Sequence, residues 1–150
     1  DWSLFLRERC FPPLIERAEV KGSMPPERRR SLDRLLDRLD TTLGGTDHRP
    51  SLLHGDLWRN NVLCNAAGEL VLIDPNPWIG DREAELAYTE WAGSFPPKFY
   101  EAYEAVWPSA PGRRDRRDVY LIWCMLRALA RGEPRGLAID GTLRWYLGPT

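Results

Sequence analysis

The 150-residue chain has few cysteines and histidines, and no excess of charge of either sign. Its three cysteines, Cys10, Cys64 and Cys124, are widely spaced in apolar surroundings and form no CxxC pair. They therefore favour reduced packing thiols in a cytoplasmic protein over a disulfide framework or a zinc site. The formal net charge of −1 offers no electrostatic footprint for nucleic acid or an anionic membrane. The most apolar run, residues 119–130, contains Arg127 and is shorter than the roughly 20 residues of a membrane-spanning helix.

The composition is nevertheless that of a folded protein. Hydrophobic residues make up 43% of the chain and charged residues 29%, and there are seven tryptophans. This content is sufficient to bury a core, so residues 1–150 are predicted to form a single domain. The arginine runs at residues 28–30 and 113–117 are interleaved with acidic residues, and we expect them to be solvated helix faces.

One segment has the residues of a phosphate-handling site. The sequence HGDLWRNN occupies residues 54–61, and Asp74 follows thirteen residues after Asn61. Kinase catalytic loops place an Asp and an Asn five positions apart, the Asp accepting the proton of the attacking hydroxyl and the Asn holding magnesium. Asp56 and Asn61 have this spacing. The pattern is typical of a phosphotransferase catalytic centre.

A β-hairpin is predicted between these residues and Asp74. Two short apolar runs, Val62–Cys64 and Leu70–Ile73, are joined by Asn65–Gly68, in which Asn and Gly suit turns with positive φ. Such a hairpin would bring Asn61 and Asp74 to about the 5 Å separation of paired strand neighbours. Magnesium prefers hard oxygen ligands and usually takes one or two carboxylates together with substrate phosphates. An amide oxygen and a carboxylate are then a sufficient protein ligand set.

Other polar and aromatic residues near this segment have a structural interpretation, and most of them also have a functional one. His54 is expected to anchor the backbone and not to transfer a proton. Trp58 and Trp78 either stack on a sugar or pack locally. Asp81 and Glu83 either position the catalytic loop or a substrate amine, or serve in helix capping and surface pairing.

HGDLWRNN and residues 71–108, VLIDPNPWIGDREAELAYTEWAGSFPPKFYEAYEAVWP, closely resemble the C-terminal lobe of the fructosamine/ketosamine 3-kinases. These are relatives of the aminoglycoside phosphotransferases in the protein-kinase-like superfamily. The resemblance extends from Asp1 to about Arg117. It implies a mostly α-helical α+β fold, a protein-kinase-like C-terminal lobe with a small β-hairpin after the catalytic loop. It also implies an ATP- and Mg²⁺-dependent kinase acting on a sugar hydroxyl of fructosamines or ketosamines.

The resemblance assigns roles by position. Asp56 would be the catalytic base, and Asn61 and Asp74 would hold Mg²⁺ and, through it, ATP. The sequence departs from the family at Asn60, commonly Gly, and at Glu85, usually Asp. After residue 117 it lacks the Asn/His-rich helix end followed by Gly-Gly that is associated with fructosamine kinases.

Kinases of this fold also need a glycine-rich turn over the phosphates, a strand Lys paired with a helix Glu, and a hinge for adenine. The sequence has no GxGxxG, no initial Met, and only two lysines, Lys21 and Lys98. We therefore expect an N-terminal ATP-binding lobe upstream in a longer protein. That lobe and a small-molecule glycated amine are the expected partners. The alternatives are another small-molecule kinase, of aminoglycoside or choline type, and a catalytically inert lobe that acts as an interaction domain.

Apolar periodicity, capping residues and proline positions also predict the helices. The expected segments are Trp2–Ala18 with a break or kink at Pro12-Pro13, Pro25-Pro26 to Leu43, a helix capped by Asp81 and running to Ala92, a helix from Pro96-Pro97 with Phe99, Tyr103 and Val106 facing inward, a buried central helix over Asp118–Ala130, and Arg135–Leu147 with Trp145 and Tyr146 as packing groups. Residues 75–80 are expected to form an irregular loop.

Overall fold

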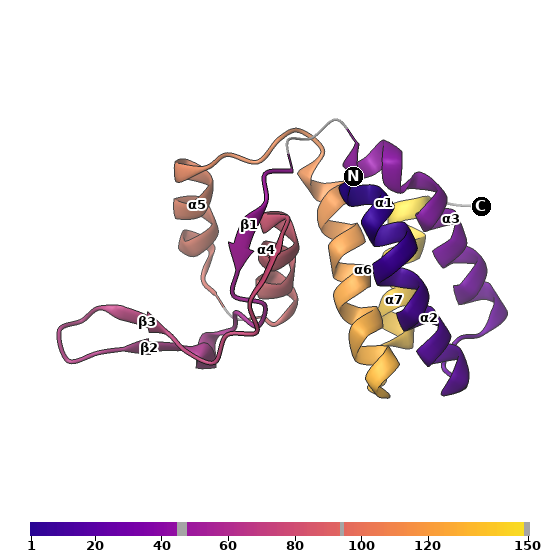
Figure 1. Cartoon of the computed structure of the whole chain (residues 1–150), viewed down its shortest axis with the longest axis horizontal. Helices are drawn as coiled ribbons and strands as arrows, with labels where there is room; N and C mark the ends of the chain where they lie inside the picture. The colour runs from indigo at the N-terminus through magenta and orange to yellow at the C-terminus, as the bar shows by residue number, and fades with distance from the viewer. Residues whose placement is uncertain (45–47, 94, 149–150) are drawn as a thin grey trace. The chain divides into compact units, whose positions relative to one another are not determined.

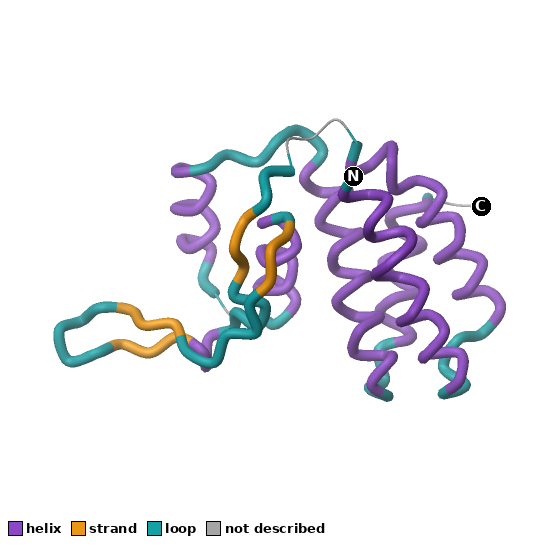
Figure 2. The backbone as a smooth tube through the Cα atoms, in the orientation of Figure 1, coloured by secondary structure: helices purple, strands orange, loops and turns teal. Residues whose placement is uncertain are grey.

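The computed structural model describes residues 1–44, 48–93 and 95–148. It is mostly helical with two small antiparallel sheets, as the sequence predicts for the fold class (Figure 2). The chain divides into two compact units, Asp1–Thr46 with Arg114–Thr150, and Asp47–Arg113. The assignment of residues 1–150 to a single domain stays a prediction.

The helical unit begins with three consecutive helical segments, α1 (Trp2–Phe5), a π-helical turn (Leu6–Cys10) and α2 (Phe11–Val20) (Figure 1). A break was predicted at Pro12-Pro13. Because prolines have no N–H to donate, the regular hydrogen-bond pattern cannot continue through them unchanged. The wider π-helical turn accommodates this just before the prolines. The predicted interruption is thus a change of helix type within an unbroken helical run.

Helix α3 (Pro26–Leu43) confirms its sequence prediction, with Pro25 as N-cap and Gly44 as C-cap. Proline suits the first helical turn because its missing N–H would have no helical partner there. The apolar stripe of α3 forms much of the core of this unit. Its leucines at positions 32, 35, 39 and 43 are all fully buried.

Two C-terminal helices complete the unit, α6 (Arg113–Arg131) and α7 (Gly136–Leu147). The central part of α6 is buried as predicted, but the helix begins five residues before Asp118. Trp145 was expected to be a packing group of α7, but its side chain is 65% exposed, so that prediction is wrong. Its ring instead lies under the guanidinium of Arg114, 4.8 Å from the ring centroid, on the surface of the unit.

Two arginines of the runs predicted to be solvated are buried. Arg116 is 2% exposed and Arg28 is 8% exposed, so the prediction is wrong at these positions. Arg28 pairs in bidentate fashion with Asp140, with N–O distances of 2.8 and 2.9 Å, and this pair joins α3 to α7. Burial of a guanidinium is tolerated when its hydrogen bonds are satisfied in this way.

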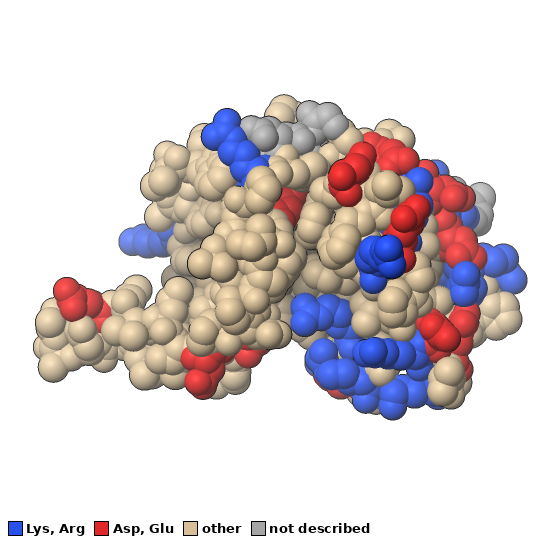
Figure 3. Space-filling model, viewed as in Figure 1, with Lys and Arg blue, Asp and Glu red and all other residues tan. Residues whose placement is uncertain are grey.

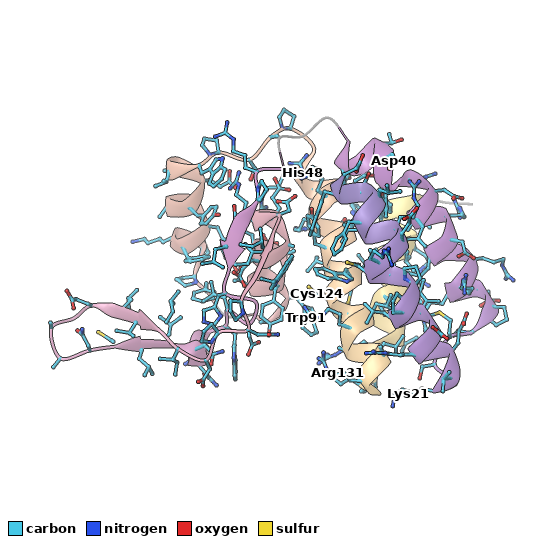
Figure 4. The ribbon with its side chains drawn as sticks, in the orientation of Figure 1. Lys21, Asp40, His48, Trp91, Cys124 and Arg131 are labelled. Atoms are coloured by element: carbon cyan, nitrogen blue, oxygen red, sulfur yellow. The ribbon has the colours of Figure 1, made fainter. Side chains whose placement is uncertain are left out.

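On the surface of this unit, basic and acidic residues lie side by side (Figure 3). Figure 4 labels one example, Asp40 on α3, which accepts a hydrogen bond from Ser3 at 2.6 Å and pairs with Arg7 at 2.8 Å. The hydroxyl of Ser3 and the guanidinium of Arg7 lower the pKa of Asp40 below its ordinary value. Among the helices that the structure describes, none is long and apolar enough to cross a bilayer.

The second unit contains the two sheets. Strand β1 (Ser51–Leu53) pairs antiparallel with β4 (Trp78–Gly80), and β2 (Val62–Cys64) pairs antiparallel with β3 (Leu70–Leu72). The β2–β3 hairpin is confirmed, and Figure 1 shows that it extends away from the rest of its unit. The prediction of an irregular loop over residues 75–80 is wrong for residues 78–80, because they form strand β4. A strand of three residues directly after Pro77 is too short to give a periodicity signal.

The helices of this unit are α4 (Arg82–Trp91) and α5 (Pro97–Val106). Asp81 caps α4 as predicted, accepting a hydrogen bond from the Glu83 N–H at 2.9 Å. Val106, expected to face inward, is 88% exposed, so that prediction is wrong. It occupies the last position of α5, and the chain leaves the helix before that side chain is covered.

Candidate functional site

The candidate catalytic loop begins where β1 ends. After Leu53 the chain turns sharply at Gly55, which has a φ of +79°. A Cβ atom at this position would lie 1.9 Å from the backbone oxygen of Asn76. The same Asn76 donates its N–H to the carbonyl of His54 at 2.8 Å. Only glycine fits both the backbone conformation and this close approach of two chain segments.

A carboxylate from α4 holds the backbone of this turn. Glu85 accepts the N–H of His54 at 2.5 Å through Oε2 and the N–H of Gly55 at 2.8 Å through Oε1. The family usually has Asp here, and the longer Glu side chain still reaches both donors. Sequence reasoning identified the position as a departure without specifying these two partners.

The Asp56 carboxylate is held through both of its oxygens. Tyr88 donates its hydroxyl to Oδ1 at 2.5 Å, and the Asn61 side-chain nitrogen donates to Oδ2 at 3.2 Å. The same Asn61 nitrogen donates to the Asp56 backbone oxygen at 2.9 Å. The structure thus brings together the predicted Asp–Asn pair. It adds Tyr88, which sequence reasoning missed, although its position three residues after Glu85 places both on one face of α4.

His54 confirms the structural role predicted for it. Its Nε2 lies 2.9 Å from the carbonyl oxygen of Ile73, and its Nδ1 lies 3.4 Å from the backbone nitrogen of Asp56. A carbonyl can only accept and a backbone N–H can only donate, so these partners define the tautomer with the proton on Nε2. The imidazole therefore connects the loop to the end of β3.

The hairpin carries Asn61 and Asp74 at its base. Val62 pairs with Leu72, and the Ile73 N–H donates to the Asn61 carbonyl at 3.0 Å. Ile73 is therefore opposite Asn61, and Asp74 lies one residue beyond the direct pairing that the sequence suggested. Asp74 has a φ of +51°, and this local left-handed backbone marks the end of the hairpin.

Asn65 and Gly68, which predicted the turn of the hairpin, stabilise it in different ways. Gly68 has a φ of +82°, as expected. Asn65 has no positive φ and acts through its side chain, whose oxygen accepts the N–H groups of Ala67 at 3.0 Å and Glu69 at 2.9 Å. This is the local side-chain capping for which Asn is favoured in turns.

The donor chemistry at the hairpin base fits a magnesium ion. Because the Asn61 nitrogen donates to Asp56, the amide oxygen of this 6% exposed residue remains available as a ligand. Asp74 is exposed and makes no described hydrogen bond or ion pair. Hard oxygens of this kind suit Mg²⁺ completed by phosphates and water. Across the described residues, no three His, Cys, Asp or Glu side chains gather to hold an ion, so the metal assignment stays a prediction.

The remaining candidates have different outcomes. Trp58 is half-buried, and its carbonyl accepts the Asn61 N–H at 2.9 Å at the start of the 3₁₀ turn Arg59–Asn61, so its contact with substrate stays a prediction. Asp81 and Glu83 are 6% and 7% exposed, and the surface pairing considered for them is wrong. Asp81 instead combines capping with a 2.5 Å contact to Nδ1 of His48.

Known proteins are similar to this chain in sequence and in fold. The family model for fructosamine kinase matches residues 1–132. A probable ketoamine kinase of Lactiplantibacillus plantarum is 38% identical over 147 residues, which cover 97% of this chain and 52% of that protein. The chloroplastic protein-ribulosamine 3-kinase of Oryza sativa subsp. indica is 39% identical over 90 residues, covering 60% of this chain and 26% of that protein.

A solved structure gives the same answer for the fold. A candidate fructosamine-3-kinase from Thermobifida fusca YX-ER1 has a TM-score of 0.84 and 31% identity, covering 97% of this chain and 51% of that one. The architecture is therefore that of the protein-kinase-like phosphotransferases. Within that class, the chain belongs to the fructosamine kinase family. It spans about half the length of the curated relatives that it matches.

Gly55→Ala tests the loop geometry against a matched substitution in the hairpin turn. Gly55 and Gly68 have similar positive φ values, but a Cβ at Gly68 has no atom within 4 Å. We expect Gly68→Ala to cost about 1–2 kcal/mol from backbone strain alone. Gly55→Ala should cost about 3 kcal/mol or more, because the Asn76 carbonyl must also move. Urea unfolding of both variants measures the difference, and equal losses would contradict the close approach.

Proposed function

We propose that this chain forms part of an ATP- and Mg²⁺-dependent kinase that phosphorylates a sugar hydroxyl of fructosamines or ketosamines. The observation that carries the proposal is the Asp56–Asn61 pair at the turn, hydrogen-bonded at 3.2 Å with the Asn61 oxygen left available. Membership of the fructosamine kinase family and the names of the relatives support this acceptor class.

Each of the three residues would have a distinct role. Asp56 would accept the hydrogen bond of the acceptor hydroxyl, orient it, and take its proton as the oxygen attacks the γ-phosphorus. Asn61 and Asp74 would hold the magnesium ion. When bound, that ion neutralises charge on the phosphates of ATP. Trp58, half-buried beside the loop, is proposed as a surface for the sugar or amine.

We propose that residues 1–150 are the C-terminal catalytic lobe, and that an N-terminal ATP-binding lobe is its partner. The half-length coverage of the relatives supports this arrangement. So does the β2–β3 hairpin, where Leu63, Leu70 and Leu72 are 50%, 74% and 54% exposed. Few charges lie on the hairpin face seen in Figure 3. The register places Leu70 and Leu72 on one face of the hairpin and Leu63 with Val71 on the other. Exposed apolar side chains gathered on one element in this way mark surfaces that another structure covers.

The thiols support a cytoplasmic location, which we also propose. The three cysteines are free. Burial raises the pKa of Cys10 to about 11 and that of Cys124, labelled on α6 in Figure 4, to about 12, consistent with inert packing thiols. Cys64 is exposed, so the prediction that it is a packing thiol is wrong; β2 places it on the open hairpin.

Two alternatives remain distinguishable by experiment. An aminoglycoside- or choline-type kinase would share the Asp–Asn arrangement, and a screen of the complete gene product against glycated amines, aminoglycosides and choline separates these acceptors. An inert lobe serving as an interaction domain would phosphorylate none of them. The ketoamine and ribulosamine kinase names of the relatives favour the glycated amines.

The magnesium ligands are tested by Asp74→Asn in the complete gene product. This change removes one ligand charge from an exposed side chain, so the fold should remain intact while phosphoryl transfer is abolished. Turnover of a fructosyl amine at several magnesium concentrations is the measurement. The matched control is Asp37→Asn, an exposed substitution on α3. Magnesium-dependent turnover of Asp74→Asn at nearly the wild-type rate would refute the assignment.

The proposed base is tested by Asp56→Asn. Because Asp56 would contact the acceptor hydroxyl and not the nucleotide, kcat should fall by about 10²–10⁴-fold while ATP affinity changes far less. Steady-state kinetics combined with nucleotide binding by calorimetry separates the two effects. A comparable loss of ATP affinity would instead make Asp56 a structural or metal-binding residue.

The two-lobe proposal predicts the behaviour of residues 1–150 alone. They should fold, but show no measurable ATP-dependent phosphorylation of a fructosyl amine and only weak Mg-ATP binding, because the sequence supplies only the metal end of a nucleotide site. Circular dichroism and a phosphate-transfer assay measure these properties beside the complete gene product. The proposal fails if the purified chain turns over at ordinary kinase rates of about 1–100 s⁻¹ and loses that activity on Asp56→Asn.

A further inference from the structure

The hydroxyl of Tyr88 makes the shortest described contact with the proposed base. Its oxygen lies 2.5 Å from Oδ1 of Asp56, so the hydroxyl donates a hydrogen bond to that carboxylate oxygen. The other oxygen, Oδ2, receives the longer 3.2 Å hydrogen bond from Asn61. Each carboxylate oxygen therefore has its own donor, and together the two donors define the rotation of the carboxylate plane.

These two hydrogen bonds leave the Asp56 carboxylate able to accept a further hydrogen bond. A carboxylate oxygen has two acceptor positions, so one position on each oxygen remains for a substrate hydroxyl. If Tyr88 did not donate, the orientation of the carboxylate would depend on the 3.2 Å bond from Asn61 alone. Near-attack geometry is sensitive to displacements of this kind, because the acceptor oxygen must stay aligned with the phosphorus.

The place of Tyr88 in the fold suits a fixed donor. It lies one helical turn after Glu85 on α4, so one helix holds both the loop backbone and the Asp56 carboxylate. Its half-buried ring packs against Trp91, with 5.8 Å between ring centroids. The ring contact positions the hydroxyl independently of any ligand.

We propose that Tyr88 is a positioning residue, whose hydroxyl holds the Asp56 carboxylate in the orientation that accepts the proton of the substrate hydroxyl. This inference rests on the proposed kinase function. It assigns no proton transfer to Tyr88 itself.

Tyr88→Phe in the complete gene product tests the proposal, since it removes the hydroxyl and keeps the ring. With a fructosyl amine and Mg-ATP, kcat should fall about tenfold while the KM for ATP stays within about twofold. The matched control is Tyr100→Phe, whose hydroxyl donates to Thr89 at 3.3 Å and not to the candidate site. That control should leave both constants unchanged.

A double-mutant cycle with Asp56→Asn distinguishes positioning from a general structural effect. If Tyr88 acts through Asp56, adding Tyr88→Phe to Asp56→Asn should change the residual kcat by less than about twofold. Proton NMR gives a second readout that needs no turnover. The hydrogen-bonded hydroxyl should give a proton resonance, protected from exchange with water, that is absent in Tyr88→Phe and displaced in Asp56→Asn.

The outcomes distinguish a failure of the proposed kinase function from a failure of the role proposed for Tyr88. An inactive wild-type protein overturns the proposed kinase function, and the role of Tyr88 with it. An active wild type whose Tyr88→Phe variant keeps its kcat overturns the role of Tyr88 alone. A tenfold loss that persists on the Asp56→Asn background shows that Tyr88 does not act through the base.

Discussion

One carboxylate holds the turn on which the candidate site is built. Glu85 accepts the backbone N–H groups of His54 and Gly55, at the point where the left-handed backbone of Gly55 turns the chain sharply. Successive amides in such a turn form a concave anion-binding arrangement, here filled by a side chain of the protein itself. Asp56 is the next residue, so its direction follows from this contact.

Helix α4 can serve as this support because its own first turn is tightly held. Asp81 caps it, and Arg82 donates to the carbonyls of Trp107 and Pro108, both at 3.0 Å. The Arg82 guanidinium also lies 4.4 Å from the centroid of the Trp107 ring. Buried polar groups with satisfied hydrogen bonds give a helix a defined position as well as stability. From that base, Glu85 and Tyr88 reach the loop at successive turns of the same face.

Local signals made much of this unit predictable. The spacing of Asp56 and Asn61, the hairpin turn and the Asp81 cap all depend on residues within a few positions of one another. Contacts over longer separations were not predicted, since the pairing of Glu85 and Tyr88 with residues about 30 positions earlier leaves no periodic trace. The exposure of Trp145 and Val106, which was not predicted either, has a related cause. Helical periodicity defines faces, but whether another element covers a face depends on tertiary packing.

The backbone hydrogen bonds of Ile73 determine which part of the hairpin can change in length. Its N–H donates to Asn61 and its carbonyl accepts from His54, so both backbone polar groups of one residue are committed to the loop side of the hairpin base. The residues between Asn61 and Ile73 form the hairpin beyond these two hydrogen bonds and take no part in them. The tip at residues 65–68 can therefore gain or lose residues during evolution, or accept an inserted tag, without displacing the start of the segment that carries Asp74.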